Sequence, residues 1–169
     1  ILGETIEEIA AEKAGIVKSA VPLVIAPQVP EALAVLQARA HATGARPLQI
    51  GRIGQVGSDP GSDVMFDVHR SDLAGQSIIV RTPVRTHNLR LPLLGVHQAE
   101  NAAVAVAAAE AMGVGPAAIA DGIADVNWIA FISIQFVKDS MASGLEAVAF
   151  GCPVYWIAGM GKSDASVLY

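Results

Sequence analysis

Two stretches of the sequence carry residue types that could do chemistry. Lys13 lies near the end of a helical pattern, Thr5–Ile16, where its amine is reactive only if it is partly desolvated; a solvated lysine is the ordinary outcome on a helix. Trp156–Ser163 (WIAGMGKS) ends in Gly-Lys-Ser, as phosphate-binding loops do. Trp156 stands where such a loop needs glycine, and the six residues after Ser163 are too few for the helix that would face the phosphate, so a strand-to-loop turn is favoured.

Helical and extended patterns alternate in the first part of the chain. Thr5 and Glu8 have the spacing of a capping box, which predicts a helix over Thr5–Ile16. Val21–Ala26 (VPLVIA) is apolar throughout, which indicates a buried strand of a parallel sheet. A second helix is predicted over Glu31–Ala42, with Gly44 as its stop. Helix, strand and helix in this order are typical of an α/β fold.

The pattern changes between Arg46 and Arg90, where short β-prone pieces alternate with Gly, Asp, Ser and Pro. Such a pattern is typical of an antiparallel sheet of hairpins, and it includes a turn at Gly57–Ser62. The expected strands are Leu48–Ile53, Val64–Val68, Ser77–Arg81 and Thr86–Leu91.

Two more helices and a second α/β unit are expected in the remainder. His97–Met112 is alanine-rich and strongly helix-forming, and Pro116–Ala124 predicts another helix. Beyond Trp128 a β-α-β unit is expected, so we predict a domain boundary near Asn127, with domains at residues 1–127 and 128–169. The elements of that unit are strands at Ile132–Val137 and Val154–Ala158 and a helix around Ala142–Phe150.

The bulk composition limits the class of partner. The 169 residues carry a net charge of −5, which argues against nucleic acid and anionic membranes. The longest apolar run, Ala102–Ala109, is too short to span a membrane, and no secretory signal pattern opens the chain. The single cysteine, Cys152, fits a reducing cytoplasm and is expected to be a buried thiol rather than a nucleophile. Because the chain begins inside an apolar turn at Ile1, we expect it to be part of a longer protein.

Two blocks of the sequence resemble one family. The first comprises Leu2–Thr5 (LGET) and Glu12–Lys18 (EKAGIVK), followed by the predicted strand; the second is Leu94–Ala103 (LGVHQAENAA), which leads into the alanine-rich helix. In this order, with Trp128 after them, they resemble the folylpolyglutamate synthase/dihydrofolate synthase family of the Mur ligase superfamily over residues 1–128. The resemblance implies an α/β fold: the C-terminal part of a Mur-ligase ATPase domain, with parallel strand–helix units and a small antiparallel sheet, then the beginning of a Rossmann-like C-terminal domain.

The resemblance also implies a role for each matching residue. Lys13 matches a lysine that is carbamylated in the family and helps to hold magnesium, whose preferred ligands are oxygens. Asn101 matches the asparagine that contacts the adenine of ATP, and Gln98, one helical turn earlier on the same face, could assist it. For His97 a histidine satisfied by backbone groups at the helix entry is at least as favoured as a ligand contact. The implied reaction is ATP-driven amide formation through an acyl phosphate, with folate and glutamate as substrates.

The sequence departs from the family in two places. The family's glycine-rich phosphate loop and its other magnesium ligands lie N-terminal to the matched blocks. After the tryptophan the family continues Pro-Gly-Arg, whereas this chain has Ile129–Phe131, so a phenylalanine replaces an arginine that contacts ATP phosphate. Further on, Phe136–Ser143 and Val154–Gly159 loosely resemble the C-terminal domain of UDP-N-acetylmuramoyl-L-alanine:D-glutamate ligase, and Asp139, which matches the aspartate of a loop there, is a candidate catalytic residue.

These observations leave several functions open. The first is a segment of an ATP-dependent ligase that adds glutamate to a folate-type substrate, inactive alone for lack of the phosphate loop. Its runner-up is a piece of a peptidoglycan ligase of the UDP-N-acetylmuramoyl-L-alanine:D-glutamate type. A second class is a non-catalytic folded or engineered fragment that self-associates through exposed strand edges. The weakest alternative is a stand-alone nucleotide-binding protein that uses Gly159–Ser163.

Overall fold

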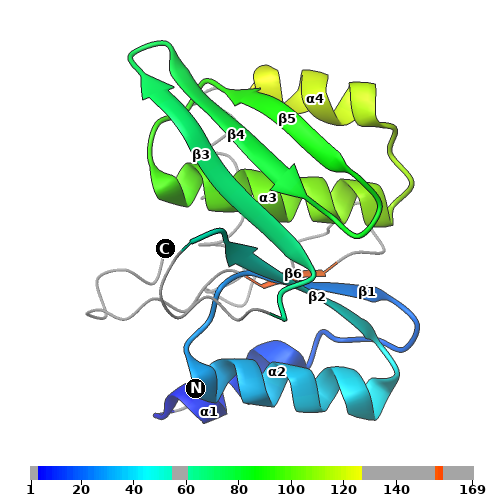
Figure 1. Ribbon diagram of the computed structural model, residues 1–169. Coiled ribbons are helices and arrows are strands. Elements are labelled where there is room, and N and C mark those ends of the chain that lie inside the picture. Colours follow the sequence, from blue (N-terminus) through cyan, green and yellow to red (C-terminus); the bar gives the residue numbers. More distant parts are fainter. Residues whose placement is uncertain (1–3, 55–60, 127–154, 158–169) are drawn as a thin grey trace.

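The computed structural model describes residues 4–54 and 61–126 and the backbone of residues 155–157. The strands are β1 Pro22–Ile25, β2 Arg46–Arg52, β3 Val64–Asp72, β4 Gly75–Arg81, β5 Thr86–Leu91 and β6 Tyr155–Ile157, and the helices are α1 Ile6–Ala14, α2 Pro30–Thr43, α3 Val96–Ala111 and α4 Pro116–Ala124. The strands form one mixed sheet in the order β5-β4-β3-β2-β1-β6. Helices cover both faces of this sheet, α1 and α2 on one side and α3 and α4 on the other (Figure 1), so the α/β class is confirmed.

Strand β1 shows why an unbroken apolar run becomes an inner strand. It pairs in parallel with β2 on one side and with β6 on the other. Successive side chains point to opposite faces: Val24 joins the core under α3, whereas Leu23 and Ile25 join the core under α2. Both faces are therefore buried, as the sequence predicts for a parallel strand.

The first helix begins with the predicted capping box. The Thr5 hydroxyl accepts from the Glu8 N–H at 3.2 Å, and the Glu8 carboxylate accepts from the Thr5 N–H at 3.3 Å. The helix ends at Ala14, earlier than predicted, and Ala14 packs against Leu36 and its neighbours in α2. The second helix, α2, ends as expected at Gly44, which has a φ of 67°.

The hairpin prediction is right for β3, β4 and β5 and wrong for β2. The first three strands pair antiparallel, but β2 runs parallel to β3, with Ile50 opposite Val64. Parallel strands need a connection that returns the chain to the same end of the sheet, so this return falls between Arg52 and Val64. Turn-forming residues predict the turn but not the direction of the next strand. Most of the turn predicted at Gly57–Ser62 lies outside the described residues.

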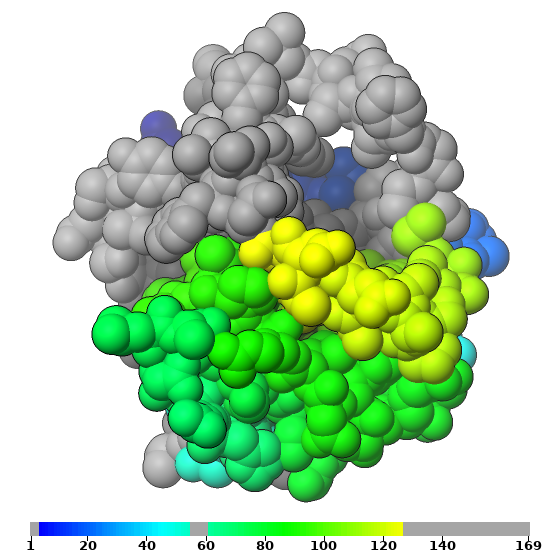
Figure 2. Space-filling view, turned by 90° about the horizontal axis from the view of Figure 1, so that it is seen from above, coloured from blue at the N-terminus to red at the C-terminus, as the bar shows by residue number. Residues whose placement is uncertain are grey.

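The face opposite α1 and α2 is built on alanine. Helix α3 buries Ala99, Ala102, Ala103 and Ala107 against the sheet, and Ile119 and Ile123 of α4 complete the same core. Seen from above, α4 forms part of the outer surface beside the β-sheet residues (Figure 2). The predicted helices at His97–Met112 and Pro116–Ala124 are thus confirmed, the first with a shift of one residue.

Much of the predicted second α/β unit lies outside the described residues, including Ile132–Val137, Ala142–Phe150 and the boundary near Asn127. The strand predicted at Val154–Ala158 is present as β6, next to β1. The division into two domains stays a prediction. Within the residues that the structure describes, no helix has both the length and the apolar character needed to cross a membrane.

Candidate functional site

The first turns of α3 carry the residues predicted to contact a nucleotide. Gln98 and Asn101 are half-buried and lie three residues apart, so their side chains share one face of the helix. Each amide offers a hydrogen-bond donor and an acceptor on the same planar group. His97 is exposed beside them. The structure thus brings the two amides together at the start of one helix.

Helix α3 starts at a glycine and has no capping side chain. Gly95 has a φ of 108°, a conformation that glycine adopts without strain, and its carbonyl accepts from the N–H groups of Gln98 at 3.0 Å and Ala99 at 3.3 Å. A side chain from β4 supports this turn: the buried Gln76 amide donates to the carbonyls of Leu93 and Gly95, each at 2.9 Å.

Gln76 was not singled out from the sequence. The expected strand began at Ser77, one residue too late to include it. A period of two would have placed it on the inward face with Ile78 and Val80, both buried. A glutamine on such a face needs hydrogen-bond partners, which is the signal that could have identified it.

Lys13 lies on the other side of the sheet from Gln98 and Asn101. It is a half-buried residue of α1, which packs with α2, whereas α3 covers the opposite face (Figure 1). An open depression of about 490 Å³ lies between α1 and α2, but Lys13 does not line it. Its lining residues are Ala11, Ala14, Gly15, Val35, Ala38, Arg39 and Ala42. Lys13 and the two amides therefore come from helices on opposite faces of the sheet.

Magnesium, which the resemblance implies, lacks a ligand set in residues 4–54 and 61–126. No three His, Cys, Asp or Glu side chains there lie close enough together to hold a metal ion. A carbamate on Lys13 would supply oxygen donors from one group, whereas magnesium requires near-octahedral coordination. The described residues alone thus do not fit a magnesium site. Asp139, Cys152 and Gly159–Ser163 lie outside them, and their predicted roles stay predictions.

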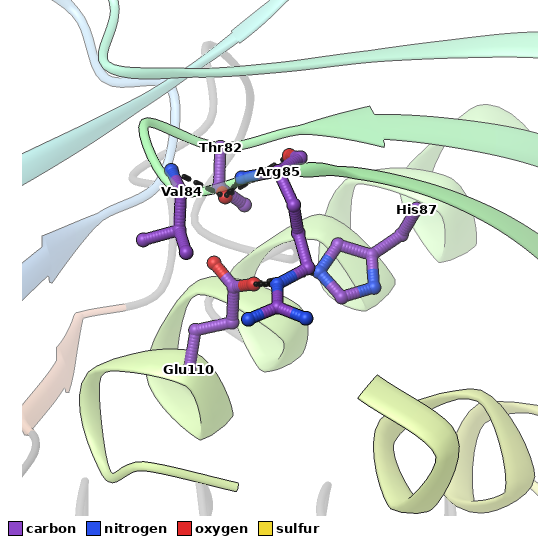
Figure 3. A network of polar contacts seen from close by, with 5 residues as sticks. All are labelled: Thr82, Val84, Arg85, His87 and Glu110. Atoms are coloured by element: carbon purple, nitrogen blue, oxygen red, sulfur yellow. Dashed lines mark hydrogen bonds and ion pairs between the residues drawn. The ribbon is translucent and has the colours of Figure 1, made fainter. Parts of the chain in front are cut away.

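The other end of α3 is held by a part-buried carboxylate. One oxygen of Glu110 (Oε1) lies 2.9 Å from His87 Nε2 and 3.0 Å from Arg85 Nε (Figure 3). The turn that presents Arg85 is shaped by Thr82, whose hydroxyl accepts from the N–H groups of Val84 and Arg85. A carboxylate near a helix C-terminus is opposed by the helix dipole, so these two partners offset an unfavourable placement. The sequence reasoning did not find this cluster.

Known proteins match the chain in sequence, although no family model does. A dihydrofolate synthase/folylpolyglutamate synthase of Bacillus subtilis is 36% identical over 156 residues, which cover 92% of this chain and 32% of that protein. A folylpolyglutamate synthase of Lacticaseibacillus casei is 31% identical over 137 residues, 76% of this chain and 29% of that protein. The chain therefore spans about a third of the length of these curated relatives.

Solved structures match the fold as well. The folylpolyglutamate synthase (FPGS) of Thermotoga maritima has a TM-score of 0.64 and 32% identity, over 74% of this chain and 28% of that one. An FPGS–AMPPCP–folate complex has a TM-score of 0.62 and 30% identity, over 76% of this chain and 30% of that one. The FPGS of Mycobacterium tuberculosis, solved with ADP and AMPPCP, has a TM-score of 0.63 and 30% identity, over 75% of this chain and 28% of that one.

The fold and the sequence are both similar to a segment of the folylpolyglutamate/dihydrofolate synthases, which is consistent with a fragment of a Mur ligase superfamily protein. Within that superfamily the chain is homologous to a segment of the folylpolyglutamate/dihydrofolate synthases, and the resemblance seen over residues 1–128 is confirmed.

Proposed function

We propose that the chain is a segment of an ATP-dependent amide ligase that adds glutamate to a folate-type substrate through an acyl phosphate. The observation that carries this proposal is the block Leu94–Ala103, which forms the entry and first turns of α3 with Gln98 and Asn101 on one face. The segment is shared with synthases that were solved with AMPPCP and folate. ATP, folate and glutamate are accordingly the proposed ligands of the full enzyme.

The described residues would contribute nucleotide recognition. The Asn101 amide can donate to and accept from the edge of an adenine ring, and Gln98 can add a contact from the same helix face. Phosphoryl transfer also needs groups that stabilise the phosphate charge. We assign no such group among the described residues, and we expect no turnover by these 169 residues alone. A cytoplasmic location stays a prediction.

One finding favours a folate ligase over a peptidoglycan ligase. The match to the Bacillus subtilis synthase spans 156 of the 169 residues, so it cannot end at Trp128. It extends into the part of the chain on which the peptidoglycan alternative rested. This supports one parent family for the whole chain.

The proposal is tested by calorimetric titration of the chain with AMPPCP and magnesium. We expect saturable binding that Asn101→Ala weakens about tenfold, because each lost hydrogen bond costs on the order of 1 kcal/mol. Asn88→Ala is the matched control, since it removes the same amide from an exposed position on β5. Absence of binding by the unsubstituted chain contradicts the proposal for this segment. Binding that is lost in Lys162→Ala but kept in Asn101→Ala would instead favour Gly159–Ser163.

A further inference from the structure

The buried glutamine of β4 has a specific place in the proposed site. We propose that Gln76 is a positioning residue, which fixes the start of α3 and thereby the two amides that contact the nucleotide. This inference rests on the proposed function. The hydrogen bonds that the Gln76 side chain donates go to the backbone that carries the first-turn side chains.

The contacts of Gln76 bracket the turn between β5 and α3. Its side-chain amide has two N–H groups, and Nε2 lies 2.9 Å from the carbonyl oxygens of both Leu93 and Gly95. The residue is 2% exposed and its bond to Leu93 is buried, whereas its bond to Gly95 is part-buried, so water cannot replace the Leu93 bond if it is lost. One side chain thus joins two carbonyls on either side of Leu94.

The carbonyl of Gly95 is also the first acceptor of the helix. It receives the N–H groups of Gln98 and Ala99 in addition to the Gln76 amide. Like α2 and α4, α3 has no side chain that caps its first N–H groups. The bond from Gln76 does not cap these groups; it holds the turn through the carbonyl that begins the helix.

The base of this support is itself fixed. Gln76 pairs with Leu91 across the β4–β5 ladder, and the preceding Gly75 has a φ of 121°. A Cβ at Gly75 would lie 2.5 Å from the Leu91 carbonyl oxygen, so the two strands approach closely at this point. The Gln76 side chain consequently starts from a backbone that cannot shift without moving β5.

Loss of the support should misplace the amides rather than unfold the chain. Gln98 directly follows the turn, and Asn101 lies one turn further along the same face. Recognition of a planar ring edge by an amide requires donor and acceptor within a few tenths of an ångström of their hydrogen-bonding distances. A turn that samples several positions would satisfy this requirement only part of the time.

The test compares Gln76→Met with His87→Phe in the full 169-residue chain. Methionine keeps the length of glutamine but donates no hydrogen bond, and His87 is a buried polar residue that serves the opposite end of α3. Amide hydrogen exchange is read at Gln98 and Ala99, and AMPPCP affinity by calorimetry. If Gln76→Met does not fold, Gln76→Asn replaces it, because its shorter amide cannot reach both carbonyls.

We expect Gln76→Met to speed exchange at Gln98 and Ala99 and to weaken AMPPCP binding about tenfold, the equivalent of one to two hydrogen bonds. His87→Phe should leave the exchange rates at Gln98 and Ala99 and the AMPPCP affinity unchanged. Equal weakening by the two variants, or unchanged first-turn exchange in Gln76→Met, would overturn the inference. Failure of the unsubstituted chain to bind AMPPCP counts against the proposed function, whereas the exchange result still decides whether Gln76 fixes the turn.

Discussion

The buried polar side chains that face the α3 layer each have a hydrogen-bond partner. Gln76 and His87 are the buried polar residues of the described chain, and both face elements of the α3 layer. A buried polar group is costly unless it is hydrogen-bonded, so each must serve a specific arrangement. At the residue scale, the two ends of α3 are defined by these bonds.

Glu110 offers a direct measure of the C-terminal support. We expect Glu110→Ala to lower the free energy of unfolding by about 3 kcal/mol, because it leaves the buried His87 and part of Arg85 without their acceptor. Glu110→Gln should cost less, since its amide oxygen still accepts. Denaturant unfolding measures both. Asp121→Ala, which removes an exposed carboxylate of α4, is the control, and an equal loss there would contradict the role of the cluster.

Lys13 can be tested apart from any metal. The family resemblance predicts a carbamate on this half-buried amine. After exposure to ¹³C-labelled bicarbonate, we expect a carbamate carbon signal by nuclear magnetic resonance that Lys13→Arg removes and Lys18→Arg retains. Identical spectra for all three proteins would contradict the prediction.

At the scale of elements, alanine substitutions at two glycines can distinguish the cost of backbone strain from the cost of a steric clash. Gly44 and Gly75 both have positive φ, but a Cβ at Gly44 would meet no atom within 4 Å, whereas at Gly75 it would collide with the Leu91 carbonyl. Gly44→Ala should therefore cost about 1 kcal/mol of unfolding free energy, the strain alone. Gly75→Ala should cost at least about 3 kcal/mol, since the β4–β5 ladder must shift as well. Denaturant unfolding measures both free energies. Similar losses for the two variants would show that the chain relaxes to avoid the clash with the Leu91 carbonyl.

The element scale also shows what local sequence could predict. The capping box at Thr5, the stop at Gly44 and the helix at Pro116–Ala124 depend on neighbours in the chain, and the structure has them where they were expected. The direction of β3 relative to β2 is set by pairing between residues distant in the sequence, so it was predicted wrongly.

In the candidate site, too, the features set by local sequence were predictable and those set by distant residues were not. Gln98 and Asn101 share a face because helical spacing is local, and this was predictable. The support from Gln76 joins residues 17 and 19 positions apart, and the pair of His87 and Glu110 joins residues 23 apart. The periodicity of a sequence does not identify partners that lie so far apart in the chain. The placement of Lys13 across the sheet likewise needed the whole fold.

At the scale of the whole molecule, the sheet formed by the described residues ends in β5 on one side and β6 on the other. Edge strands present unpaired backbone groups, and we expect the chain to self-associate through them. Sedimentation should give a mass that rises with concentration. Asn88→Lys, which adds a charge to β5, should reduce this rise. A monomer at every concentration would contradict the expectation.

The alanine face of α3 has a consequence for how substitutions are transmitted. Ala99, Ala102, Ala103 and Ala107 have no side-chain rotamers, so these four positions cannot repack around an added methyl group. A larger residue such as valine at Ala103 would push the whole helix away from the sheet. Asn101, two residues away, would move with it. This buried face therefore sets the height of the proposed nucleotide contacts above the sheet, and we expect substitutions in it to change nucleotide affinity.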